Sequence, residues 1–169
     1  MDFIEILTQT FQDPVMYSFL FFIYTILAAV ILPIPVEIGL FNPYLHPVLL
    51  ISILALGKGV GAAIVFIIGA RLRSFLQRFN SSSTITKKIL FYCEQFVRKY
   101  GHVGLFIIMS IPLMIDSVSL YLFSLLNPKE ETGKHVLAKR KFILINIGAG
   151  IVRGSIIMVV FYVFQVQLV

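Results

Sequence analysis

Four charged residues stand inside long apolar stretches of the sequence, where charged side chains are uncommon. Glu37 and Asp116 each follow a proline within an apolar run. Lys58 and Arg153 each fall near the middle of another such run. At mid-depth in a bilayer, a charge costs about 2.5–3.5 kcal/mol on insertion scales unless it is paired or hydrated. We therefore expect these residues to form a substrate- or proton-binding site, although the sequence does not fix which acid pairs with which base.

Prolines interrupt both of the runs that carry an acid. Pro33 and Pro35 precede Glu37, and Pro112 precedes Asp116. A proline removes a backbone donor and clashes with the preceding turn. Irregular backbone at membrane depth is tolerated only where protein or a water-filled cavity surrounds it. Each run is therefore predicted to turn back as a re-entrant hairpin with its acid near the tip. The alternative is an ordinary surface loop in which the acid is solvated.

The composition indicates an integral membrane protein. Of the 169 residues, 59% are hydrophobic and 13% are charged, against about 25% charged in a typical soluble domain. The net charge is +6, but the basic residues gather beside apolar runs, where lipid headgroups account for them better than nucleic acid does. The single cysteine, the three histidines and the acids show no metal-ligand spacing, and no nucleophile set or phosphate-binding loop is present. We expect no enzyme activity, metal or cofactor.

The remaining pattern divides the chain into helices. Runs 47–70 and 142–164 are long enough to cross a bilayer core of about 30 Å. Residues 85–100 have helical spacing with basic residues on the other face and Gly101 as a C-cap, which predicts an interfacial helix. We expect an interfacial N-terminal helix and one membrane domain, in which a linker helix separates two half-repeats. Their ranges are 1–14 and 15–169, with the domain divided into 15–76, 77–100 and 101–169.

The distribution of charge predicts the orientation. Basic residues cluster at 71–100 and 127–141, whereas the N-terminal segment is acidic and the C-terminal segment is uncharged. The positive-inside rule puts both basic segments in the cytoplasm and both termini opposite. The fold is then an all-α inverted repeat, in which each half is a re-entrant hairpin followed by a transmembrane helix. Such repeats place transport sites at the midplane, so Glu37 and Asp116 should approach each other there.

Glycines recur in both predicted crossings. Gly57, Gly61 and Gly69 lie in the first, and Gly148 lies in the second. Small residues at this kind of spacing let the backbones of membrane helices approach closely. We expect these four glycines to serve helix packing.

These motifs together resemble the DedA family of membrane proteins, also described as the SNARE-associated Golgi or VTT-domain family. The sequence Pro33-Ile34-Pro35-Val36-Glu37 looks like that family's proline-rich re-entrant segment, and Gly69-Ala70-Arg71 looks like the end of its glycine-rich helix. Lys99-Tyr100-Gly101 looks like the start of its second motif, and Asn146 with Gly148 looks like its late Asn/Gly helix. The resemblance covers most of the chain. It implies two opposed re-entrant hairpins and lipid-carrier or phospholipid translocation, often dependent on the proton gradient.

Two departures from the family pattern mark a divergent member. The family's second hairpin usually carries Arg-Phe-x-Pro-x-x-Arg, but here the two arginine positions around Pro112 read Met109 and Ile115. An acid commonly found before the first hairpin is also missing, since residues 26–32 are uncharged. Our hypothesis is that Lys58 and Arg153 supply the lost positive charge.

The leading functional hypothesis is a multi-pass transporter or scramblase of the cell membrane, or of an organelle membrane in a eukaryote. It would move an anionic lipid, such as a phospholipid or a polyprenyl phosphate, between leaflets. Glu37 and Asp116 would face a polar cavity and exchange protons, while Lys58 and Arg153 attract the phosphate. One alternative is a non-transporting scaffold that binds anionic lipid or partner proteins. The other is a proton-coupled transporter of a small solute or ion, which would need no lateral opening to the bilayer.

Overall fold

The computed structural model describes residues 9–32, 35–79, 84–127 and 137–164. Within these ranges the chain is helical and has no strand, which confirms the predicted all-α class. The elements are α2 (Pro14–Val30), the 3₁₀ helix η1 (Val36–Leu40), α3 (Pro47–Phe79), α4 (Thr84–Ser110), α5 (Asp116–Leu125) and α6 (Lys139–Phe164). Pro33, the 80–83 linker, most of the polar loop before α6 and most of the predicted N-terminal helix lie outside the described residues.

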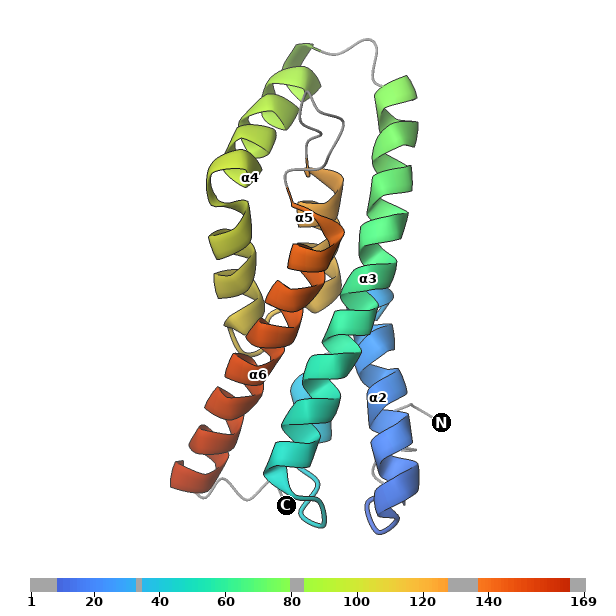
Figure 1. Cartoon of the computed structure of the whole chain (residues 1–169), viewed down its shortest axis with the longest axis vertical. Coiled ribbons are helices and arrows are strands. Elements are labelled where there is room, and N and C mark those ends of the chain that lie inside the picture. The colour runs from blue at the N-terminus through green and yellow to red at the C-terminus, as the bar shows by residue number, and fades with distance from the viewer. Residues whose placement is uncertain (1–8, 33–34, 80–83, 128–136, 165–169) are drawn as a thin grey trace.

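Two long helices, α3 and α6, run side by side along the molecule and form its centre (Figure 1). The chain reverses direction between α2 and η1, which pack beside the first part of α3. It reverses again between α4 and α5, which occupy the opposite half of the molecule from α2 and η1. Both reversals lie near the middle of the molecule in Figure 1, so two segments distant in sequence approach each other there.

The two central helices contain segments that are long and apolar enough to cross a membrane. These segments are Pro47–Arg73 and Lys139–Phe161, with 27 and 23 residues. At about 1.5 Å per residue they are about 40 Å and about 35 Å long, more than the roughly 30 Å of a hydrocarbon core. Both predicted crossings are therefore helices of sufficient length.

The predicted helix end at Gly101 is wrong, because α4 continues through this residue to Ser110. A glycine inside a helix costs about 1 kcal/mol relative to alanine. Here the space that a side chain would fill is taken by Val97 and Leu137, which lie 3.2 Å and 3.3 Å from the Cβ position. Packing against Leu137 offsets the propensity cost, and the apolar run that follows carries no proline before Pro112.

The apolar core is divided into two clusters. One contains Phe66, Leu105, Leu120 and Phe142, among other side chains of α3 to α6. The second involves α2, η1, the start of α3 and the end of α6, and its largest members are Tyr17, Phe21, Tyr24, Leu50 and Leu54. Along α3, Lys58 falls between the two clusters, and Arg153 does so along α6. The fold therefore places these two bases between two apolar regions.

Candidate functional site

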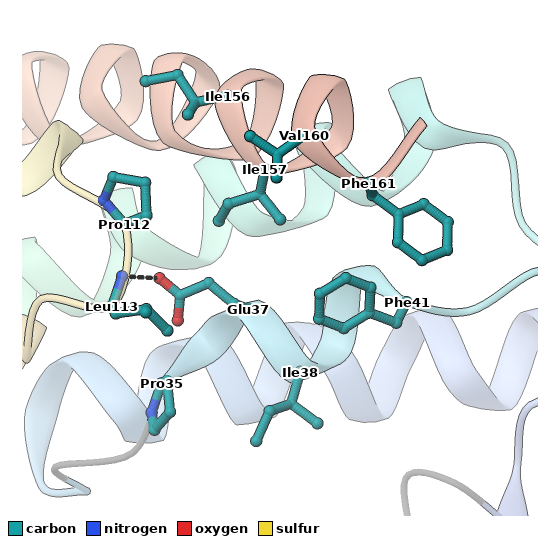
Figure 2. A pocket seen from close by; sticks show the side chains of 10 residues that line it. All are labelled: Pro35, Glu37, Ile38, Phe41, Pro112, Leu113, Ile156, Ile157, Val160 and Phe161. Carbon is teal, nitrogen blue, oxygen red and sulfur yellow. Dashed lines mark hydrogen bonds between the residues drawn. The ribbon is translucent and has the colours of Figure 1, made fainter. Parts of the chain in front are cut away.

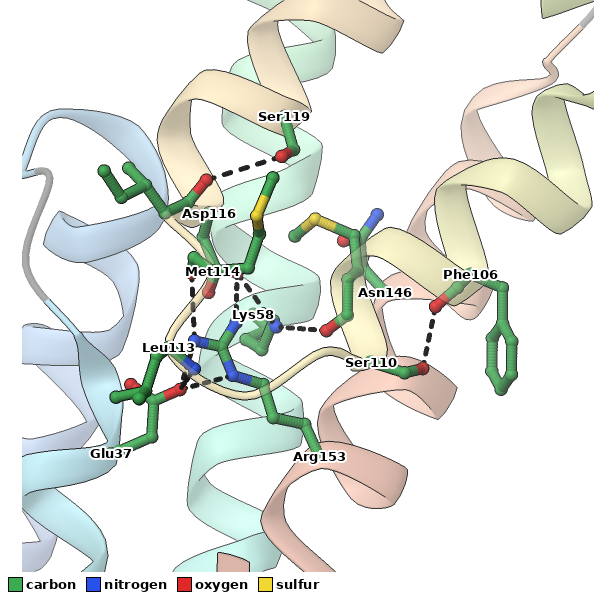
Figure 3. Close-up of polar contacts among 12 residues, drawn as sticks. Glu37, Lys58, Phe106, Ser110, Leu113, Met114, Asp116, Ser119, Asn146 and Arg153 are labelled. Atoms are coloured by element: carbon green, nitrogen blue, oxygen red, sulfur yellow. Dashed lines mark hydrogen bonds and ion pairs between the residues drawn. The ribbon is translucent and has the colours of Figure 1, made fainter. Parts of the chain in front are cut away.

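The four charged residues singled out by sequence meet in one place, which we call the charged cluster: Glu37, Lys58, Asp116 and Arg153 (Figure 3). They come from η1, α3, the start of α5 and α6, respectively. Lys58 and Arg153 are 0% exposed, and Glu37 and Asp116 are each 4% exposed. The prediction that the two acids approach each other is confirmed, and the solvated loop is excluded for both.

Glu37 is positioned by the attachment of η1 to α2. Pro35 fixes the backbone that leads into η1, and the Tyr24 hydroxyl donates a hydrogen bond of 3.0 Å to its carbonyl. The Tyr17 hydroxyl donates to the carbonyl of Gly39 at 2.7 Å. A side chain at Gly39 would overlap the ring of Phe21. These contacts hold η1 against α2 and aim Glu37 away from it, toward the other half of the chain.

Asp116 is positioned by the 111–115 turn, which joins α4 to α5. Pro112 cannot continue the helix that ends at Ser110. Leu113 adopts a positive φ of 61°, and its backbone N–H donates to Glu37 Oε1 at 2.8 Å (Figure 2). Asp116 is then the first residue of α5, where the helix dipole favours a carboxylate.

Arg153 joins the two acids. Its Nη1 donates to Asp116 Oδ1 at 2.7 Å, and its Nε donates to Glu37 Oε1 at 2.6 Å. Its Nη2 donates to the same Glu37 oxygen and to the carbonyl of Met114 at 2.9 Å. The guanidinium therefore connects η1 to the 111–115 turn and to α5.

Lys58 pairs with only one of the acids. Its Nζ lies 3.1 Å from Asp116 Oδ1 and donates to the carbonyl of Met109 at 3.2 Å. Gly150 leaves room for the lysine stem, since its Cβ position lies 3.3 Å from Lys58 Cδ. Asp116 is thus shared by both bases, whereas Glu37 pairs with Arg153 and not with Lys58. The sequence left this assignment open.

The charged cluster is formally neutral, because two acids face two bases. Buried charges are costly to desolvate, and removing one partner of such a pair typically costs about 3–5 kcal/mol. Not every buried oxygen in this region is bonded, however. Among the described residues, Glu37 Oε2, Asp116 Oδ2 and Asn146 Oδ1 have no hydrogen-bond partner.

A pocket of about 290 Å³ lies between η1, the 111–115 turn and α6 (Figure 2). Of the described residues that form its wall, Glu37 alone has an ionisable side chain, and the others are apolar. At the end away from Glu37, the rings of Phe41 and Phe161 face each other with centroids 5.3 Å apart. This pocket differs from the polar cavity that we expected, because the acids and bases neutralise one another instead of lining an open space.

Three of the four predicted packing glycines lie at close helix contacts. A side chain at Gly57 or Gly61 would overlap Thr25 or Ala29 of α2, and one at Gly69 would overlap Ser124 of α5. Gly148 is looser, since its Cβ position has only Phe106 nearby, at 3.5 Å. Close packing is confirmed for the three glycines of α3.

Sequence reasoning missed a second buried polar group at the end of α5. The Arg73 guanidinium donates to the carbonyls of Asn127 and Leu125. The Asn127 side chain donates to the Leu137 carbonyl at 2.9 Å and accepts from the Leu137 N–H at 2.8 Å. These bonds connect α3, the end of α5 and the chain that leads into α6. Arg73 ends an apolar run in sequence, which made it indistinguishable from a headgroup-facing base.

Asn146 was noted only through the family resemblance and proves to be fully buried on α6. Its Nδ2 donates to the Phe142 carbonyl one turn earlier, at 2.8 Å. It lies one turn before Gly150, the residue that contacts Lys58. The available signal was a single amide side chain inside the last apolar run.

Comparison of the chain with protein-family models, with curated proteins and with solved structures finds no match. Membership of the DedA family therefore stays a prediction, which rests on the motifs quoted above.

Proposed function

We propose that the chain is a multi-pass membrane protein of the DedA type that moves a lipid with an anionic headgroup between leaflets. The observation that carries this proposal is the pocket between η1 and α6, which is apolar and has Glu37 of the charged cluster in its wall. An apolar groove that leads to buried charges matches a molecule with an apolar tail and a charged head.

In this proposal α3 and α6 cross the bilayer. The pairs α2–η1 and α4–α5 are re-entrant hairpins that enter from opposite sides, so the chain is an inverted repeat with the charged cluster at mid-depth. Large apolar side chains on the outer faces of the central helices support a lipid environment; they include Leu56, Ile64, Leu144 and Val159. The basic segments 71–100 and 127–141 would face the cytoplasm.

The shape of the pocket favours a lipid over a soluble solute. Its rim includes Leu113, Ile156 and Val160, which are exposed on the outside of the helix bundle. In a bilayer these side chains face acyl chains, so the pocket opens laterally. A lipid tail would lie along the apolar wall while the headgroup reaches Glu37 and, behind it, Arg153.

The charged cluster supplies the chemistry for the headgroup. Arg153 and Lys58 attract a phosphate, since guanidinium and ammonium groups form strong charge-assisted hydrogen bonds with phosphate oxygens. Glu37 and Asp116 are the counter-charges that hold the two bases in place when no lipid is bound. Proton coupling is part of this proposal.

Leaflet exchange in proteoliposomes tests the proposal. Vesicles holding a fluorescent phosphatidylglycerol are treated with a bleaching reagent that reaches only the outer leaflet. We expect the full chain to make the inner-leaflet probe bleachable, and Val160→Phe to slow this exchange by narrowing the pocket. Val159→Phe is the matched control, because this exposed neighbour on α6 does not line the pocket.

Exchange no faster than in protein-free vesicles would contradict lipid movement and favour the scaffold. Equal slowing by the two valine variants would contradict the assignment of the pocket. A solute transporter would leave the lipid probe unmoved and carry a small anion instead, which vesicles loaded with that anion would reveal.

A further inference from the structure

The hydrogen bonds around Glu37 fall on one oxygen only. Oε1 accepts from Arg153 Nε at 2.6 Å, from Arg153 Nη2 and from the Leu113 N–H at 2.8 Å. Oε2 is buried and has no partner among the described residues. An arginine–carboxylate pair usually gains its strength from two parallel bonds that use both oxygens. The three donors therefore form a cradle for a single oxygen, and the second oxygen of the carboxylate is left without a partner.

The cradle borders the apolar pocket. Leu113 and Glu37 both line the pocket wall, so a group that enters the pocket from the bilayer comes next to the cradle. The positive φ of Leu113 is uncommon for a residue other than glycine. Such backbone conformations persist where the surroundings impose them, and they cluster at ligand-binding sites. In this conformation the Leu113 N–H is held next to the guanidinium of Arg153, on the same acceptor.

We propose that this cradle binds a phosphate oxygen of the lipid headgroup and that the Glu37 carboxylate is an internal plug that occupies it until lipid arrives. This inference rests on the proposed function and assigns its binding site. Displacing Glu37 leaves Arg153 oriented, because Nη1 remains on Asp116 and Nη2 remains on the Met114 carbonyl.

The charge of the vacated site defines the ligand. Without Glu37, the bases Lys58 and Arg153 face only Asp116, so two positive charges and one negative charge leave a formal +1. A phosphate with one negative charge restores neutrality. The ligand class is therefore a monoanionic phosphate, carried on a lipid because the pocket that leads to the cradle is apolar.

Binding to the purified full chain in an uncharged detergent tests the plug. The probe is dodecyl phosphate, compared with inorganic phosphate and with dodecanol. A plug that fills the cradle most of the time lowers the apparent affinity for any competing anion, so Glu37→Gln should bind dodecyl phosphate about tenfold more tightly than the unaltered chain. Adding Arg153→Met to this variant should abolish the gain.

Asp116→Asn is the matched control, because it removes the same charge from the charged cluster but leaves the carboxylate of Glu37 in the cradle. We expect no gain from it. An equal gain would mean that net charge alone attracts the anion, and it would overturn the plug. An absence of any gain in Glu37→Gln would also overturn it.

Two further measurements keep the inference testable if Glu37→Gln does not fold. Glu37→Asp keeps the charge but withdraws the carboxylate by one methylene, so it should also bind dodecyl phosphate more tightly. In the unaltered chain, saturating dodecyl phosphate should increase deuterium uptake at η1 as Glu37 leaves the cradle. The plug is contradicted if Glu37→Asp binds dodecyl phosphate no more tightly than the unaltered chain. It is also contradicted if dodecyl phosphate leaves the deuterium uptake of η1 unchanged.

The probes separate the sources of the phosphate. If inorganic phosphate binds as tightly as dodecyl phosphate, the cradle is supported but its assignment to a lipid is overturned. If dodecanol binds as tightly, the assignment of the cradle to a phosphate group is overturned. These experiments measure the binding of a lipid phosphate and not its movement between leaflets. Tight binding in a chain that exchanges no lipid would therefore contradict only the proposed function, and exchange without a gain in Glu37→Gln would contradict only the plug.

Discussion

The two segments that return from the chain reversals, η1 and α5, are held in different ways. The ten residues of α5 pack on α3, where the Ser124 hydroxyl lies 3.3 Å from the carbonyls of Val65 and Phe66. Arg73 and Asn127 then fix its end. The five residues of η1 and the preceding Pro35 are bonded to α2 by two tyrosines, and η1 faces α6 across the pocket.

This difference indicates which of the two segments can shift at the lower cost in free energy. Local opening requires less free energy where fewer buried contacts are broken. A shift of η1 breaks two tyrosine hydrogen bonds and the bonds of Glu37 to Arg153 and Leu113, and it widens an existing pocket. A shift of α5 breaks the bonds of Asp116 to both bases and, in addition, the packing of its ten residues on α3. We therefore assign the mobile role to η1 and the fixed role to α5.

The largest expected effect is a difference in stability between variants of the two acids, Asp116 of α5 and Glu37 of η1. Asp116→Ala leaves both Lys58 and Arg153 without a shared carboxylate, and removing one partner of a buried pair costs about 3–5 kcal/mol. Glu37→Ala should cost less, because Arg153 keeps its bonds to Asp116 and to the Met114 carbonyl. Thermal unfolding of the two variants in one detergent checks the order. A larger loss for Glu37→Ala would reverse the assignment of fixed and mobile segments.

The next effect concerns the glycines of the central helices. Gly69→Ala would overlap the Ser124 hydroxyl and force α5 away from α3, and overpacking of this kind costs about 1–3 kcal/mol. Gly148→Ala is the control, because its nearest contact is at 3.5 Å and alanine improves helix propensity by up to about 1 kcal/mol. Unfolding temperatures of both variants test this. Equal losses of stability would show that α5 packs on α3 no more closely than α4 packs on α6.

The smallest effect is expected at the tyrosine hydroxyls. Tyr17→Phe removes one hydrogen bond to η1 and Tyr24→Phe removes one to Pro35, which leads into η1. Each bond is worth about 1 kcal/mol. Deuterium uptake should rise at η1 and stay unchanged at α5. Ser124→Ala is the matched variant for the other half and should raise uptake at α5 alone. If the tyrosine variants leave the uptake of η1 unchanged, the hydroxyls do not hold this segment.

The convergence of Glu37 and Asp116 could be predicted from the sequence, because charges and prolines inside apolar runs restrict the chain strongly. A mid-run charge needs an internal partner, and a proline ends the helix that precedes it. Together with the basic segments, these signals bring the two acids to one place. The two long helices followed from the length of their apolar runs.

Other features depend on contacts that sequence patterns do not contain. The sharing of Asp116 by two bases, and the role of Leu113 as a backbone donor, follow from how the 111–115 turn packs. The Arg73 bonds depend on where α5 ends. Gly101 resembled a helix end because its role is in packing against Leu137, a residue that is distant in sequence.

The neutrality of the charged cluster determines how a membrane voltage acts on the protein. One elementary charge moved across the bilayer gains or loses about 2.3 kcal/mol per 100 mV. Because the two acids and two bases sum to zero, a displacement of the whole set does no electrical work. In the proposed lipid transport, as long as no proton moves with the lipid, the potential then acts only on the charge of the carried headgroup. Net flow of an anionic lipid would follow the polarity of an applied potential, and flow of a zwitterionic lipid would not respond to it.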